Sequence, residues 1–226
     1  MFAAAAPGRE PMINPVAVMV VTIAVAAGQP ARATTEPALP RLVVRIYDSS
    51  GLAGRDMKTA AATVRAAFRR AGMDAVWLDC SLLEAALLNS ACQQPVGPAE
   101  VVVRIIRAKA DRTDRALGYT RVFEAGSGGW LATVLGDRVN EVARRADIDA
   151  GTLLGRVIVH EIVHLLEGRP VHSVSGLMRA EWSDEEIRRG SGMDWSLSGP
   201  DAVQARRGYL ARLAKPFGGS PAPQRE

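Results

Sequence analysis

The residues that could do chemistry gather in one short segment. All three histidines of the chain fall between residues 160 and 172, in the string HEIVHLLEGRPVH. On an α-helix, residues four apart lie on one face about a turn from each other, so His160 and His164 can direct both imidazoles at one metal ion. His172 follows a Gly-Arg-Pro turn and can supply a third ligand. Three protein ligands and one open position suit a catalytic zinc ion, so the spacing predicts a Zn²⁺ site.

Glu161 is the acidic residue inside this pair of helical ligands. A carboxylate beside a zinc-activated water can accept its proton and later pass it to the leaving amine of a peptide bond. The sequence therefore predicts Glu161 as the general base, beside the metal ligands His160, His164 and His172.

The first 33 residues have the features of an export signal. Residues 15–27 form an apolar run that is short for a membrane span, and Ala31-Arg32-Ala33 has the small-x-small pattern that signal peptidase reads. We expect cleavage after Ala33 and a secreted or periplasmic protein without stable membrane insertion. The alternative is a retained N-terminal anchor. Export also predicts a disulfide between the two cysteines of the chain, Cys80 and Cys92.

The composition fits one globular domain with processing segments. The chain has 226 residues, of which 48% are hydrophobic. Its net charge of +4 comes from scattered basic residues without interleaved aromatics, which argues against nucleic acid as a partner. We expect a monomer that acts on a protein or peptide substrate. The expected segments are a signal peptide (1–33), a lead-in (34–40), a metallopeptidase-like domain (41–215) and a flexible tail (216–226).

The hydrophobic pattern predicts an α+β domain. Alternating or continuous apolar runs indicate strands, and apolar residues at three- and four-residue steps indicate helices. We expect the metal-binding helix to begin near 149–152 and to end at 167, with one face on the sheet and the histidines facing a cleft. The other expected elements are strands at 42–47, 75–78 and 100–106, an edge hairpin of 117–123 with 130–135, and helices at 57–71, 139–146, 183–190 and 200–213.

This order of elements and motifs resembles the metzincin clan of zinc metallopeptidases, and within it the matrixins. His172-Ser173, the small-residue turn Ser175–Met178 and a last helix opened by Leu197-Ser198-Gly199-Pro200 match the family's order over residues 41–214. The resemblance implies a zincin fold: a mixed twisted sheet with an edge hairpin, a long active-site helix and a small C-terminal helical subdomain. It also implies Met178, or less well Met193, as the methionine beneath the metal. The edge strand at 117–123 would pair with an extended peptide, unless it is an ordinary edge strand.

The loop before His172 departs from the family. The family pattern has a glycine three residues after the second histidine and the third ligand three residues later, and Glu167 and Pro170 occupy these positions. Gly168 and His172 come one and two residues late, so the turn is longer. The resemblance implies a zinc-dependent endopeptidase. The alternatives are a zinc-bound envelope protein without catalytic activity, and a gluzincin-like hydrolase that uses Glu181 as a ligand.

Overall fold

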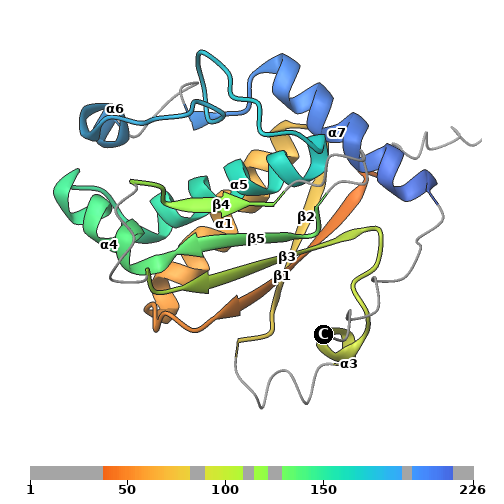
Figure 1. The fold of residues 1–226 in the computed structure, drawn as a ribbon, viewed down its shortest axis with the longest axis horizontal. Coiled ribbons are helices and arrows are strands. Elements are labelled where there is room, and N and C mark those ends of the chain that lie inside the picture. Colours follow the sequence, from red (N-terminus) through yellow and green to blue (C-terminus); the bar gives the residue numbers. More distant parts are fainter. Residues whose placement is uncertain (1–37, 82–89, 109–114, 122–128, 190–194, 216–226) are drawn as a thin grey trace, which may run out of the picture. The chain divides into compact units, whose positions relative to one another are not determined.

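The computed structural model describes residues 38–81, 90–108, 115–121, 129–189 and 195–215. The chain divides after Pro37 into two units, and all the described residues belong to the second, Ala38–Glu226. This unit is an α+β domain built on a mixed five-stranded sheet (Figure 1). The predicted signal peptide and the predicted tail lie outside the described residues.

Four strands of the sheet run parallel, and the fifth runs antiparallel at one edge. The strand order is β2-β1-β3-β5-β4, with β4 paired antiparallel to β5. This pairing confirms the predicted edge hairpin, although β4 is described over three residues and the end of the predicted arm, 122–123, lies outside the described part. The bounds are β1 (Arg41–Asp48), β2 (Asp74–Asp79), β3 (Glu100–Ile106), β4 (Gly118–Thr120) and β5 (Leu131–Leu135).

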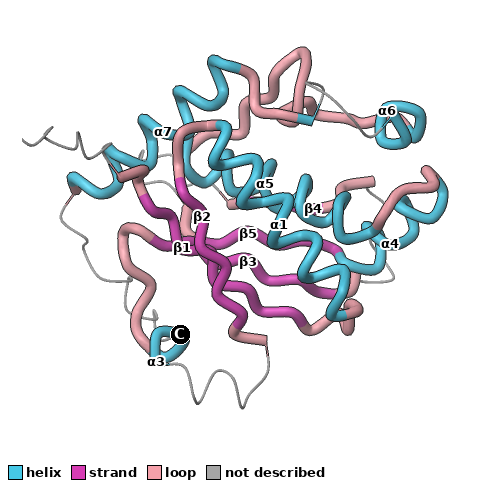
Figure 2. Tube along the Cα trace, turned by 180° about the vertical axis from the view of Figure 1, so that it is seen from behind, coloured by secondary structure: helices cyan, strands magenta, loops and turns pink. Residues whose placement is uncertain are grey.

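Helices α1 (Gly54–Arg70) and α5 (Ala150–Glu167) lie side by side on one face of the sheet (Figure 2). Their close approach requires small residues on α5. A Cβ at Gly151 would lie 2.4 Å from the Asp56 carbonyl oxygen, and one at Gly155 would lie 2.6 Å from the Thr63 Cβ. Helices α4 (Gly136–Arg145) and α7 (Gly199–Ala214) also contact α5, so α5 is the central helix of the domain.

The ends of α5 follow from local chemistry, as the sequence predicts. Asp149 caps the first turn, where its side chain accepts the Thr152 N–H at 2.7 Å. Gly168 adopts the left-handed conformation, with φ of 69°, and its N–H donates to the His164 carbonyl oxygen. These two signals fix the helix at the expected bounds.

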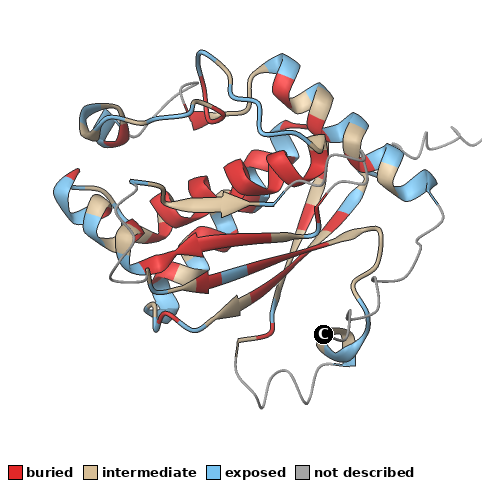
Figure 3. Cartoon of the chain, viewed as in Figure 1, coloured by how far each residue is buried: buried red, intermediate tan, exposed pale blue. Residues whose placement is uncertain are grey.

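The burial of α5 is more extensive than the sequence-based prediction, which has one face on the sheet and the histidines facing a cleft. Every residue from Leu153 to Leu166 is buried, so the helix is red along most of its length in Figure 3. The histidines at 160 and 164 are among them. The reason is that α1, α4, α7 and the strands surround the helix. The histidines therefore lie inside the domain rather than on an exposed surface.

Within the described part, no helix combines the length and the apolar character needed to span a bilayer.

The Cys80–Cys92 disulfide is present, as predicted, with the two Cα atoms 5.8 Å apart. It closes a segment that ends in the short helix α3 (Ser90–Gln93), which the sequence analysis missed. Arg45, buried on β1, donates hydrogen bonds to the Gln94 carbonyl oxygen at 2.7 Å and to the Glu100 carboxylate at 2.5 Å. The disulfide segment is thus held against the sheet near β3.

Candidate metal centre

Helix α5 places two imidazoles against each other. The Nε2 atoms of His160 and His164 lie 3.0 Å apart, and both residues are buried, with exposed fractions of 8% and 6%. The four-residue spacing puts them on the same face one turn apart. The structure therefore confirms that these two histidines converge.

Backbone carbonyls orient both rings. His160 Nδ1 lies 3.0 Å from the Leu177 carbonyl oxygen, and His164 Nδ1 lies 3.3 Å from the Arg169 carbonyl oxygen. A carbonyl oxygen can only accept a hydrogen bond, so each Nδ1 carries the proton and each Nε2 presents a lone pair. This second contact of a metal-binding histidine fixes its tautomer and the direction of its ring.

Two facing lone pairs repel each other unless a positive charge lies between them. Burial lowers the pKa of His160, and burial together with the neighbouring histidines lowers the pKa of His164 to about 4, so both rings are neutral at neutral pH. A metal ion could supply that charge without protonating either ring. Zinc–nitrogen bonds of about 2.0–2.1 Å in a tetrahedron place nitrogens roughly 3.3 Å apart, close to the spacing observed here.

His172 completes the cluster from a loop. Ligand atoms of His160, His164 and His172 all lie within 4.8 Å of one another, so the three residues could hold a metal ion. The His172 ring centroid is 5.3 Å from that of His160 and 4.9 Å from that of His164. Unlike the other two, His172 is exposed.

The loop that carries His172 is tied to the last helix. The Ser173 N–H donates to the Met178 carbonyl oxygen at 2.8 Å, and the Ser173 hydroxyl donates to Asp201 at 2.6 Å. Asp201 also forms a capping box with Ser198 at the start of α7. Asp201 is not among the site residues predicted from the sequence, although the pattern Ser198-Gly-Pro-Asp201 is a capping signal that places it at a helix start.

Glu161 points toward the edge strand. Its carboxylate accepts a hydrogen bond from the Thr120 hydroxyl at 2.5 Å. Gly118 lies so close that a Cβ there would be 2.8 Å from Glu161 Oε1. Burial raises the pKa of Glu161 to about 7, and the Thr120 hydrogen bond partly offsets this. A carboxyl group with a pKa near the working pH is suited to proton transfer.

An aromatic pair borders the first histidine, which the sequence analysis did not anticipate. The Trp182 ring meets the His160 ring edge-on, with centroids 5.6 Å apart, and also meets the Trp195 ring at 5.1 Å. The Arg156 guanidinium lies 4.0 Å from the centre of the Trp195 ring. Arg156 precedes His160 by one turn of α5, so these contacts cover the side of the site next to that turn.

The other residues that the sequence suggests for the site lie in different surroundings. Met178 is buried in the turn after His172, and the carbonyl oxygen of its neighbour Leu177 lies against His160 Nδ1. Met193 lies outside the described residues. Glu181 is exposed, and the metal-ligand cluster found among the described residues consists of the three histidines without it. The predicted capping box of Ser183 with Glu186 is confirmed at the start of α6 (Asp184–Arg189).

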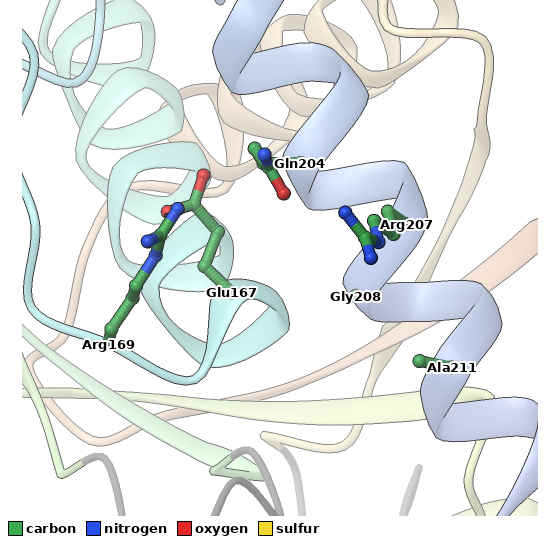
Figure 4. A pocket seen from close by; sticks show the side chains of 6 residues that line it. All are labelled: Glu167, Arg169, Gln204, Arg207, Gly208 and Ala211. Carbon is green, nitrogen blue, oxygen red and sulfur yellow. Dashed lines mark ion pairs between the residues drawn. The ribbon is translucent and has the colours of Figure 1, made fainter.

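A pocket of about 410 Å³ lies between the end of α5 and α7 (Figure 4). It is lined by Glu167, Arg169, Gln204, Arg207, Gly208 and Ala211. The Arg169 carbonyl oxygen lies against His164 Nδ1, but neither the histidines nor Glu161 line the pocket. The pocket is therefore next to the loop that leads to His172 and separate from the cluster.

Comparisons with known proteins give no family for this chain. No protein-family model matches it, and no curated protein matches it. The geometry of the site is therefore the basis for assigning a function.

Proposed function

We propose that the protein is a zinc-dependent endopeptidase of metzincin type. The observation that carries the proposal is the convergence of His160, His164 and His172. A structural zinc site is closed by four protein ligands, whereas three ligands leave a position for water or substrate. Glu161, a buried carboxylate, follows His160 directly on α5, and a proton acceptor in the site would favour hydrolysis over a purely structural role.

His160 and His164 would hold the ion through Nε2, with their rings oriented by backbone carbonyls, and His172 would add a ring nitrogen from its loop. When bound, zinc would polarise the peptide carbonyl and make water a better nucleophile at neutral pH. Glu161 accepts the proton of the attacking water and transfers it to the nitrogen of the leaving amine. The Thr120 hydroxyl holds one carboxylate oxygen of Glu161, leaving the other for this transfer.

The edge strand supports a peptide substrate. Among the described strands, β4 pairs with β5 alone, and its residues Gly118 and Thr120 contact Glu161. An extended peptide that added to β4 through main-chain hydrogen bonds would bring a backbone carbonyl close to the base. The antiparallel β4 and the turn with Met178 are consistent with the metzincin arrangement, which we include in the proposal.

We also propose that the protein acts outside the cytoplasm. The apolar run at 15–27 with the cleavage pattern at Ala31–Ala33 supports export. The Cys80–Cys92 disulfide supports an oxidising compartment, because disulfides are rare in the cytosol.

The decisive experiment compares wild type with Glu161→Gln, both loaded with zinc, on a broad peptide library. Glutamine keeps the size of the side chain but cannot accept the proton, so hydrolysis should fall about 10²- to 10⁴-fold. Zinc content should remain at one ion per chain. A hydroxamate, which chelates the open position, should block the wild-type activity.

Glu181→Gln is the matched control, since it removes a nearby exposed carboxylate that lies outside the cluster. It should leave both cleavage and zinc content unchanged. If zinc-loaded wild type cleaves no peptide, or if Glu161→Gln cleaves as well as wild type, the peptidase proposal is wrong and a zinc-binding envelope protein takes its place.

A further inference from the structure

One face of the last helix is exposed and combines aliphatic with basic side chains. At 3.6 residues per turn, the residues concerned fall within an arc of about 120° on α7. All of them are exposed, with Val203 at 65%. We call them the outer face of α7: Val203, Arg206, Arg207, Leu210, Leu213 and Ala214.

The opposite side of α7 fixes the orientation of this face. Tyr209 is buried, and its hydroxyl donates to the Arg41 carbonyl oxygen. Arg212 donates to the carbonyl oxygens of Gly129 at 3.0 Å and Glu100 at 2.8 Å. A rotation that turned the aliphatic side chains inward would break these bonds, so the outer face remains toward solvent.

The charges of the outer face all have one sign. Arg206 and Arg207 flank Leu210 and Val203, and Lys215 follows at the end of the helix. The one acidic residue of α7, Asp201, is buried and bonded to the Ser173 loop. Two copies of this face would oppose arginine to arginine, which disfavours self-association. A nucleic acid could pair with the arginines, but it would bury none of the aliphatic side chains at the centre of the face, so it fits this face less well.

We infer that the outer face of α7 binds the surface of an anionic phospholipid bilayer. Leu210, Val203 and Leu213 would enter the boundary between headgroups and acyl chains, as the apolar face of an interfacial helix does. The two arginines can extend from the sides of this centre to the phosphates. Such binding is peripheral and needs no membrane-spanning helix.

The pocket between α5 and α7 adds a place for a lipid headgroup. Arg207 belongs both to the outer face and to the pocket, where Arg169 provides a second guanidinium (Figure 4). Glu167 is the acidic residue of the lining; its side chain is only 7% exposed and lies 3.6 Å from Arg169. The exposed charge at the pocket is therefore mainly that of the arginines, which suits a phosphate.

The loop of the third histidine meets the inner side of α7, because the Ser173 hydroxyl donates to Asp201, which is buried on the side of the helix opposite Val203. A bilayer bound to the outer face would therefore lie on the side of α7 away from this contact. The inference does not depend on the proposed peptidase activity.

The test measures vesicle binding of protein recovered from the exported fraction of an expression host. Phosphatidylcholine vesicles with phosphatidylglycerol should bind the protein more tightly than vesicles of phosphatidylcholine alone, and high salt should weaken the binding. Arg206→Gln with Arg207→Gln should lower the partition coefficient about 30-fold, which is about 2 kcal/mol for two basic residues. The matched control is Arg55→Gln with Lys58→Gln, an exposed basic pair at the start of α1.

An environment-sensitive fluorophore attached at one position reports whether that position enters the lipid. It therefore identifies the surface that contacts the bilayer independently of the affinity. A nitrobenzoxadiazole label at Ala214→Cys should shift to the blue and brighten with anionic vesicles. The same label at Ala66→Cys, exposed on α1, should not change. The inference is overturned if the Ala214 label does not respond, if the α1 pair weakens binding as much as the α7 pair, or if Leu210→Ser abolishes a dimer instead of lipid binding.

Discussion

Gly118 lies against the proposed base, which makes Gly118→Ala a test of whether the position of Glu161 matters. A Cβ at this site would lie 2.8 Å from Glu161 Oε1 and 3.0 Å from the Thr133 carbonyl oxygen. The strand cannot withdraw easily, because β4 is paired with β5 at this point. Ordinary separations of about 3.5 Å then require the carboxylate to move by roughly 0.7 Å.

The expected effect on catalysis follows from this displacement. A misplacement of about 1 Å costs up to about 10²-fold in rate, so Gly118→Ala should lower kcat about 10- to 100-fold. Crowding in a packed site should also lower the free energy of unfolding by about 1–3 kcal/mol. Zinc content should not change, because the strand does not contact the ligands through this residue.

A double-mutant cycle separates displacement of the base from general damage. In a Glu161→Gln background, Gly118→Ala should lower the residual rate much less than it does in wild type, because the base is already absent. Gly54→Ala is the control, since a Cβ there has no atom within 4 Å. Equal losses in both backgrounds, or wild-type kinetics in a folded Gly118→Ala protein, would refute the reasoning.

Three further perturbations test other parts of the structure. His172→Ala should lower zinc affinity strongly while Glu181→Ala should leave it nearly intact; metal analysis that showed the reverse would favour the gluzincin alternative. Replacing Cys80 and Cys92 together by serine should lower the free energy of unfolding by about 2–4 kcal/mol in urea titrations, and an unchanged midpoint would contradict a stabilising bridge. Trp182→Ala should weaken zinc binding about 10-fold, because His160 would lose the ring that packs against it, whereas Trp182→Phe should largely preserve the affinity. If the two variants bound zinc equally well, Trp182 would have no role in positioning His160.

Local signals explain why much of the fold follows from the sequence. Asp149 and Gly168 bound α5 because a cap and a left-handed glycine act within a few residues. The edge hairpin follows from alternating side chains on either side of a glycine-rich turn. The pair His160 and His164 follows from helical geometry alone, so the sequence predicts their convergence without knowledge of the fold.

Contacts between distant segments explain what sequence reasoning missed. Periodicity indicates one apolar stripe on α5, but whether the other side is open depends on α7, which comes some 30 residues later in the chain. The Trp182 ring contacts His160 only because the segment after His172 folds back beside α5. Gly118 looks like an ordinary strand glycine until Glu161 is placed against it. These relations depend on tertiary packing, which a local pattern does not encode.

The attachment of the last helix to the first strand has a consequence for synthesis. Tyr209 bonds the Arg41 carbonyl oxygen across 168 residues of sequence, and Arg212 bonds the start of β3. These contacts cannot form until α7 has left the ribosome, long after β1, since the N-terminal part emerges first. The sheet and α7 therefore join late in translation. Such late closure is compatible with the export that we propose, because the emerging chain remains in a form that an export channel can accept.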